Sequence, residues 1–203
     1  SLTPKEIPTG AVRYNTDTDR MEVYIGSTWM EVAVSTPNLG ISESASGTRG
    51  LYVAGSNVPS NPASPHIDMI TISTAGNAVD FGDDTAGRRG NRGGASRTRG
   101  VTGGGAGPTP RTNVISFQTF ASTGTADDFG DLSIIRTCDG ASNQTRCLFM
   151  GGEGDPGNKS RIDAVTIAST GSEFQFGELT GNDAGAASFS SPTRGFYIGG
   201  SGD

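Results

Sequence analysis

Hydrophobic and polar residues alternate along three stretches of the chain that are closely alike. In each stretch Ile, Val or Phe alternates with Thr and Ser before a closing glycine: IDMITISTAG at 67–76, ISFQTFASTG at 115–124 and IDAVTIASTG at 162–171. A period of two residues is typical of a strand that buries one face. Apolar residues nowhere recur at helical spacing, so an all-β fold with almost no helix is predicted.

These strands belong to a longer repeat, which a Thr-Arg pair marks. The arginines of the four pairs lie 50, 47 and 48 residues apart: Arg49, Arg99, Arg146 and Arg194. Each pair leads into an apolar strand that ends in glycine, then a loop rich in Gly, Pro and Asn, then the alternating strand. A third strand with a Phe-Gly pair follows, and a polar strand rich in Ser and Gly leads to the next pair. A sequence motif that recurs at a nearly fixed spacing indicates a repeat architecture.

Four short strands per repeat are typical of one blade of a β-propeller. The glycine pairs at the strand ends and the length of the repeat resemble kelch repeats over residues 45–203. We therefore predict a kelch-like β-propeller of about four small blades, with three full repeats and a fourth that starts at 182–202. Three ways of completing the ring stay open. N-terminal strands add to the C-terminal pair, a longer natural chain supplies the rest, or protomers complete one another.

Residues 1–35 are predicted to form a separate β module for docking or oligomerisation, ahead of a repeat domain at 36–203. Strands are expected at 11–15, 20–26 and 28–34, because acidic and Gly-Ser turns separate these stretches. A sheet of three short strands is marginally stable alone. The module must therefore pack against the repeat domain, a neighbouring chain, or both.

Aromatic residues dominate the energetics of interfaces, so the module's aromatic residues are its predicted contact points. Trp29 and Met30 are the expected anchors, and Tyr14 and Tyr24 lie on the neighbouring strands. The alternative is that Trp29 fills a small core of the module itself.

The segment at 7–32 resembles a hairpin module of tailed-phage virion proteins, where it lies beside fibre, spike or decoration domains. The resemblance rests on a Pro-Thr-Gly, an Arg-Tyr-Asn-Thr, an acidic turn and a Gly-Ser-x-Trp: Pro8, Thr9, Gly10, Arg13, Tyr14, Asn15, Thr16, Tyr24, Gly26 and Trp29. The repeats, with their TIASTG, FGELT and TRG phrases, also resemble units in structural proteins of marine and cyanobacterial phages.

This resemblance implies a non-enzymatic virion structural protein, made in the host cytoplasm and carried on the surface of the extracellular particle. Its partners would be other virion proteins, further copies of the chain (a trimer is one option) and a host-surface glycan or protein. Host attachment as a tail-fibre or receptor-binding protein is expected first, and a capsid decoration or head fibre protein is the alternative. The variable loops at 56–66, 103–112 and 152–161 would carry recognition. A lectin-like propeller and a glycan-degrading tailspike are further alternatives.

Charge and hydropathy narrow the range of partners. The net charge of −6 argues against a nucleic-acid partner, and no stretch approaches the ~18 apolar residues of a membrane span. Because the chain starts with Ser and lacks a basic-then-apolar start, we expect a processed or trimmed product. A local basic cluster is interpreted as a solvated loop and strand edge: Arg88, Arg89, Arg92, Arg97 and Arg99.

The residues suited to catalysis or metal binding form no convincing set, so no enzyme and no cofactor are expected. The one histidine, His66, follows a proline in a loop and is expected to be solvated. A glycan-cleaving site would need paired carboxylates, for which Asp127 with Glu153 or Asp155 is the candidate. Acidic residues near the Phe-Gly strands offer oxygens for calcium, although a charged sheet edge explains them equally well: Asp83, Asp84, Asp127, Asp128 and Asp131.

The two cysteines, Cys138 and Cys147, are too few for a disulfide scaffold. Pairing across a hairpin stays open. Cys147 stands where the other repeats have glycine, which favours a small buried residue over a redox or metal role.

The repeated arginines are predicted to occupy equivalent places in successive blades: Arg49, Arg99, Arg146 and Arg194. A guanidinium fork can bond carbonyls or carboxylates of the next unit, so we interpret these residues as clamps between blades. Ligand binding by the same residues is the alternative.

Overall fold

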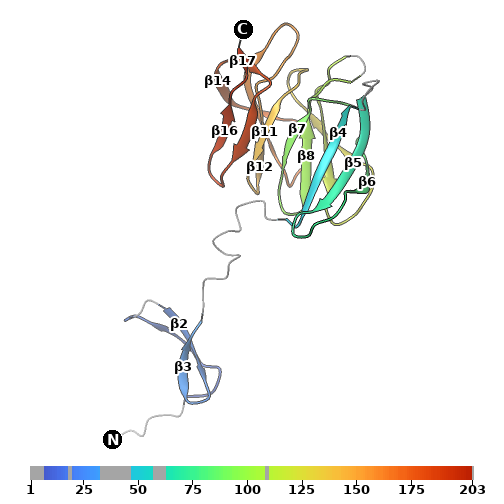
Figure 1. Ribbon diagram of the computed structural model, residues 1–203. Coiled ribbons are helices and arrows are strands. Elements are labelled where there is room, and N and C mark those ends of the chain that lie inside the picture. The colour runs from blue at the N-terminus through green and yellow to red at the C-terminus, as the bar shows by residue number, and fades with distance from the viewer. Residues whose placement is uncertain (1–6, 18–19, 33–46, 57–62, 108–109, 203) are drawn as a thin grey trace, which may run out of the picture. The chain divides into compact units, whose positions relative to one another are not determined.

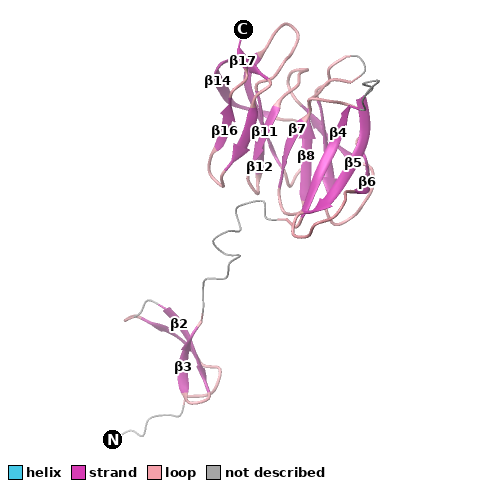
Figure 2. Ribbon diagram, in the orientation of Figure 1, coloured by secondary structure: helices cyan, strands magenta, loops and turns pink. Residues whose placement is uncertain are grey.

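The chain folds into two units made of β-strands. The computed structural model describes residues 7–17, 20–32, 47–56, 63–107 and 110–202 (Figure 1). The two compact units are Ser1–Ser42 and Glu43–Asp203, and the predicted boundary between residues 35 and 36 lies outside the described residues. In these described ranges every regular element is a strand and none is a helix (Figure 2), which confirms the all-β prediction.

The N-terminal unit is an antiparallel sheet in the order β1-β2-β3. Its strands are β1 (Val12–Asn15), β2 (Arg20–Ile25) and β3 (Thr28–Glu31), all at predicted places. These strands pair with one another in a sheet of their own. The blade that would combine them with C-terminal strands is therefore absent from the described part of the chain.

The repeat unit consists of consecutive antiparallel sheets, numbered here from first to fourth. The first contains β4 (Arg49–Ser56), β5 (Ala63–Thr71) and β6 (Val79–Asp83). The second contains β7 (Arg92–Ala95), β8 (Arg99–Gly103), β9 (Val114–Thr119) and β10 (Asp127–Asp131).

The third sheet repeats the order of the second. It contains β11 (Asp139–Ser142), β12 (Arg146–Met150), β13 (Lys159–Thr166) and β14 (Phe174–Ala184), and the short β17 (Ser201–Gly202) adds to β14. The fourth sheet has only β15 (Ala187–Ser190) and β16 (Gly195–Ile198). Several small sheets that follow one another in this way are consistent with a β-propeller-like fold.

The hydrophobic core lies between successive sheets rather than inside any one of them. One cluster joins the second sheet to the third and is fully buried: Val101, Ile115, Phe129, Leu132, Cys138, Cys147, Phe149, Val165 and Ile167. A smaller cluster joins the first sheet to Ala126, which precedes β10: Ile67, Phe81 and Ala126, with Leu51, Val53 and Met69 beside them. Each sheet is too small to shield its apolar face alone, so burial depends on its neighbour.

The recurring Phe-Gly pair marks a backbone contact between consecutive repeats. The amide of Gly124 donates to the carbonyl of Phe81 at 2.8 Å, and the amide of Gly171 donates to the carbonyl of Phe129 at 2.8 Å. Gly130, at φ 146°, lies so close to the next repeat that an added Cβ would stand 2.5 Å from the carbonyl oxygen of Gly171. Both glycines of the pattern thus let two backbones meet.

Candidate functional site

One side of the N-terminal sheet is apolar and exposed. Side chains on a strand alternate between faces, and the register Val12↔Val23, Tyr14↔Met21 and Val23↔Met30 places these residues on the same side. Val12 is 60% exposed and Met30 is 52% exposed, although both are apolar. We call this surface the apolar face, and its members are Val12, Tyr14, Met21, Val23, Ile25 and Met30.

The opposite side of the same sheet is polar. Arg13 Nε donates to Glu22 Oε2 at 2.7 Å, and Asn15 Nδ2 donates to Glu22 Oε1 at 2.9 Å. These hydrogen bonds, from Asn15 and then from Arg13, hold the pKa of the Glu22 carboxyl below its ordinary value. The Arg13 guanidinium lies 4.2 Å from the centroid of the Trp29 ring, which is 5.2 Å from the Tyr24 ring.

The four residues predicted as interface contacts are thus divided between opposite faces. Tyr14 and Met30 lie on the apolar face, whereas Tyr24 and Trp29 contact each other with tilted rings beside Arg13 on the polar one. The apolar alternation along β2 was visible in the sequence. The cross-strand register that adds Met30 and removes Trp29 was not.

Two of the four repeated arginines reach across to the next sheet. Arg49 Nη1 donates to the carbonyl of Phe120, and Arg99 Nη1 donates to the carbonyl of Ile167 at 3.0 Å. Both acceptors stand four residues before the glycine that closes the alternating strand. Arg146 instead lies 5.6 Å from the ring centroid of Phe176 in its own sheet, and Arg194 lines the cleft between the third and fourth sheets.

Two other arginines, which the sequence did not single out for this role, are buried between sheets. Arg88 Nε donates to Asp84 Oδ2 at 2.6 Å, and its Nη1 donates to the carbonyl of Val114 at 2.7 Å. Arg136 Nη2 donates to Asp163 Oδ2 at 2.9 Å and to the carbonyl of Phe149 at 3.0 Å.

The interpretation of Arg88 as part of a solvated basic cluster is therefore wrong, because its side chain is only 2% exposed. A signal for both residues does exist in the sequence. Arg88 and Arg136 each stand seven residues after the phenylalanine of a Phe-Gly pair.

The two cysteines are free thiols, and both are buried. Burial raises the pKa of the Cys138 thiol to about 11 and raises the pKa of Cys147 further. Cys147 is fully buried in the core, as the glycine at this position in other repeats led us to expect. Both thiols therefore remain protonated at neutral pH and act as small apolar groups.

The acidic residues considered for calcium do not converge. Within the described ranges, no group of three or more His, Cys, Asp or Glu side chains is arranged to hold a metal ion. Asp84 is committed to the buried pair with Arg88. His66 Nδ1 lies 3.1 Å from Asp83 Oδ1 on an exposed surface. No helix long and apolar enough to cross a membrane occurs in the part of the chain that the structure describes.

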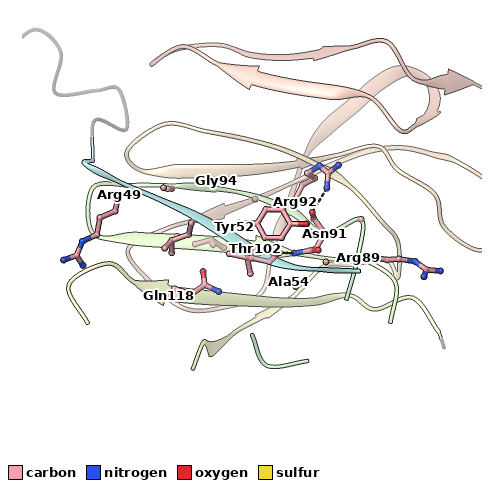
Figure 3. Close-up of a pocket in the computed structure, with 18 of the residues that line it drawn as sticks. Arg49, Tyr52, Ala54, Arg89, Asn91, Arg92, Gly94, Thr102 and Gln118 are labelled. Atoms are coloured by element: carbon pink, nitrogen blue, oxygen red, sulfur yellow. Dashed lines mark hydrogen bonds between the residues drawn. The ribbon is translucent and has the colours of Figure 1, made fainter. Parts of the chain in front are cut away.

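A cleft of about 590 Å³ lies along the edge of β4, facing β7 and β8 (Figure 3). Its lining includes Tyr52, Asn91 and Gln118, and the buried amide of Gln118 has no hydrogen-bond partner in the described structure. In the later sheets a strand occupies the corresponding place, since β7 pairs with β8 and β11 pairs with β12. The cleft is thus the position of a first strand, which the described part of the first sheet lacks.

Comparison with known protein families gives no match, and comparison with curated proteins gives none at a significant level.

Proposed function

We propose that the chain is a non-enzymatic structural protein of a phage virion. In this proposal the N-terminal sheet docks the chain to the particle and to other copies of itself, and the repeat unit is displayed for attachment to the host. The observation that carries the proposal is the segregation of the N-terminal sheet into an exposed apolar face and a polar face.

A sheet of three short strands with six apolar side chains on one side needs a cover to be stable in water. The polar face needs none, because its charges are paired: Arg13 with Glu22, and Arg20 with Glu31. Only one face of the module is therefore suited to docking, and its chemistry favours another apolar protein surface over a glycan or an ion.

The repeat unit has the properties expected of a displayed domain. It consists of short strands closed by glycine turns, with buried ion pairs at the junctions between sheets. We propose an open, propeller-like arrangement of about four blades for it, in which apolar side chains on the first and fourth sheets stay exposed. The loops at 103–107 and 152–158 join strands at one end of the second and third sheets and offer surfaces for recognition.

The experiment measures the mass of the full chain in solution with one charge placed on the apolar face. Met30→Glu is expected to lower the mass by abolishing the association made through the N-terminal sheet, because the carboxylate would be buried there without a partner. Ser27→Glu, in the exposed turn beside β3, is the matched control and should leave the mass unchanged.

The same pair of variants tests the virion role. Incorporation into particles of the phage that encodes the chain should be lost with Met30→Glu and kept with Ser27→Glu, and labelled particles show whether the chain is on the tail or on the head. A head position would favour capsid decoration over host attachment. Normal incorporation of the Met30→Glu variant would overturn the docking role.

A further inference from the structure

Consecutive sheets of the repeat unit always meet in the same orientation. The second sheet presents Val101, Ile115 and Phe117 to the third, which presents Cys147, Phe149 and Val165 in return. We call the surface that a sheet presents to the next sheet along the chain its forward face. The surface that it presents to the preceding sheet is its rear face. Each junction therefore joins the forward face of one sheet to the rear face of the next.

The repeated arginines follow the same direction. Arg49 of the first sheet donates to the carbonyl of Phe120 beyond the second sheet's β9, and Arg99 donates to the carbonyl of Ile167 beyond the third sheet's β13. The corresponding position in the first repeat is Ile72, four residues before Gly76. Arg194 occupies the donor position at the start of the fourth sheet.

The two ends of the repeat unit expose one face of each kind. The repeat alignment places Tyr52 and Ile72 on the rear face of the first sheet, where they are 66% and 64% exposed. Phe189 and Ile198 lie on the forward face of the fourth sheet, and both are 53% exposed. Phe189 stacks on Phe196, with 5.0 Å between their ring centroids, so this face is a preformed aromatic surface.

We propose that the rear face of the first sheet in one copy packs on the forward face of the fourth sheet in a second copy of this chain. Within the repeat unit a forward face packs on a rear face. This chain has one exposed face of each kind. Both surfaces are mostly apolar, with Tyr52, Ile70 and Ile72 on one and Phe189, Phe196 and Ile198 on the other. The register also places two acidic residues on the first surface, Asp68 opposite Tyr52 and Asp80 beside it. The contact is heterologous, so it adds copies head to tail.

The internal junctions indicate which residues meet. An added Cβ on Gly103 would stand 2.7 Å from the ring of Phe149. Ile198 occupies the position of Gly103 in the fourth repeat, and Tyr52 occupies the position of Phe149 in the first. Ile198 of one copy therefore lies against Tyr52 of the second, and Arg194 donates to the carbonyl of Ile72 across the same junction.

Disulfide trapping between two full-length variants tests this contact. Chains with Tyr52→Cys are mixed with chains with Ile198→Cys under oxidising conditions. The native thiols are both buried, so the introduced cysteine is the exposed one. The mixed pair should cross-link about tenfold faster than either variant alone, because association raises the effective concentration of the two thiols. Ile198→Cys mixed with Thr123→Cys, on an exposed turn, is the matched control.

Every chain in this experiment also carries Met30→Glu, so that the N-terminal sheet does not bring copies together. The proposal is independent of the virion role, and its failure would leave that role intact. Equal rates for the mixed pair and the control pair would overturn it.

A second measurement tests the head-to-tail direction. Ile72→Lys and Phe196→Lys, each again in a chain that carries Met30→Glu, place a charge on one of the two faces, and each variant alone should be a single chain. Mixed together, they should form dimers of one chain of each kind and nothing larger, because each retains one intact face. Association of either variant with itself, or no association in the mixture, would contradict the heterologous contact.

Discussion

The side chains that join consecutive sheets are arginines of two kinds, which differ in burial. Arg88 and Arg136 are enclosed, and each donates to a carboxylate and to carbonyls of the following sheet. Arg49 and Arg99 lie nearer to solvent and donate to single carbonyls. The planar guanidinium group has five donors, so arginine suits both the buried and the exposed positions. Only Arg88 and Arg136 carry the free-energy cost of removing a charge from water.

Arg136→Ala should therefore be strongly destabilising. The substitution leaves the buried Asp163 carboxylate with only the partly exposed Arg161 as an ionic partner, and it also removes the donor to the carbonyls of Arg161 and Phe149. We expect a loss of about 3–5 kcal/mol in the free energy of unfolding. Arg111→Ala removes an ion pair with Glu153 that is open to solvent, and it should cost less than about 1 kcal/mol. Urea unfolding followed by circular dichroism measures both, and equal losses would contradict a structural role for the buried pair.

The buried thiols predict a loss of stability in alkaline solution. The pKa of Cys138 is raised from 9.0 to about 11 in the folded chain, so the folded state holds a proton that the unfolded state releases between these values. The contribution is fully present below pH 9 and is lost as the pH rises toward 11, by roughly 2 kcal/mol. In Cys138→Ala the free energy of unfolding should fall less steeply over this range. The same slope in both proteins would show that the thiol is not the cause.

At the scale of the elements, the Phe-Gly pairs join consecutive repeats through their backbones. In the second sheet the strand pairing is interrupted there by a β-bulge between Asp128 and Gly130. Gly130 of the second repeat touches the backbone of Gly171, whereas Gly177, its counterpart in the third repeat, has open space around it. Gly130→Ala should cost about 1–3 kcal/mol, because alanine is strained at this φ and its Cβ meets a carbonyl. Gly177→Ala should change stability by less than about 0.5 kcal/mol. Thermal unfolding of the two variants measures the difference, and equal midpoints would show that the bulge is not a junction.

The strands could be predicted from the sequence because alternation is a local property. The stretches at 115–124 and 162–171 contain most of β9 and most of β13, and the three N-terminal strands were found by their turns. The burial of Arg88 could not be predicted in this way. Arg88 donates to the carbonyls of Gly104 and Val114, which are 16 and 26 residues away from it in the sequence. They approach Arg88 only when the chain has folded into packed sheets. The apolar face was missed in part for the same reason, since it depends on the register between strands.

At the scale of the whole molecule, the repeat unit shares its core between sheets, and the N-terminal sheet belongs to a second compact unit. Cores shared between neighbours make repeat proteins unfold cooperatively across the shared junctions. The second and third sheets, which share the largest cluster, are therefore expected to lose structure together. The N-terminal sheet contributes no residue to either described cluster, so its unfolding should be independent.

The single tryptophan makes this independence measurable. Trp29 lies in the N-terminal sheet, so its fluorescence reports on that unit alone, whereas the circular dichroism of the strands is dominated by the longer repeat unit. Phe149→Ala removes a fully buried ring between the second and third sheets and should lower the free energy of unfolding seen by circular dichroism by about 3–5 kcal/mol. The fluorescence transition of Trp29 should stay where it is in the unsubstituted chain. A common shift of both signals would mean that the two units unfold together. The repeat unit of the same chain could then cover the apolar face of the N-terminal sheet, and no outside partner would be needed.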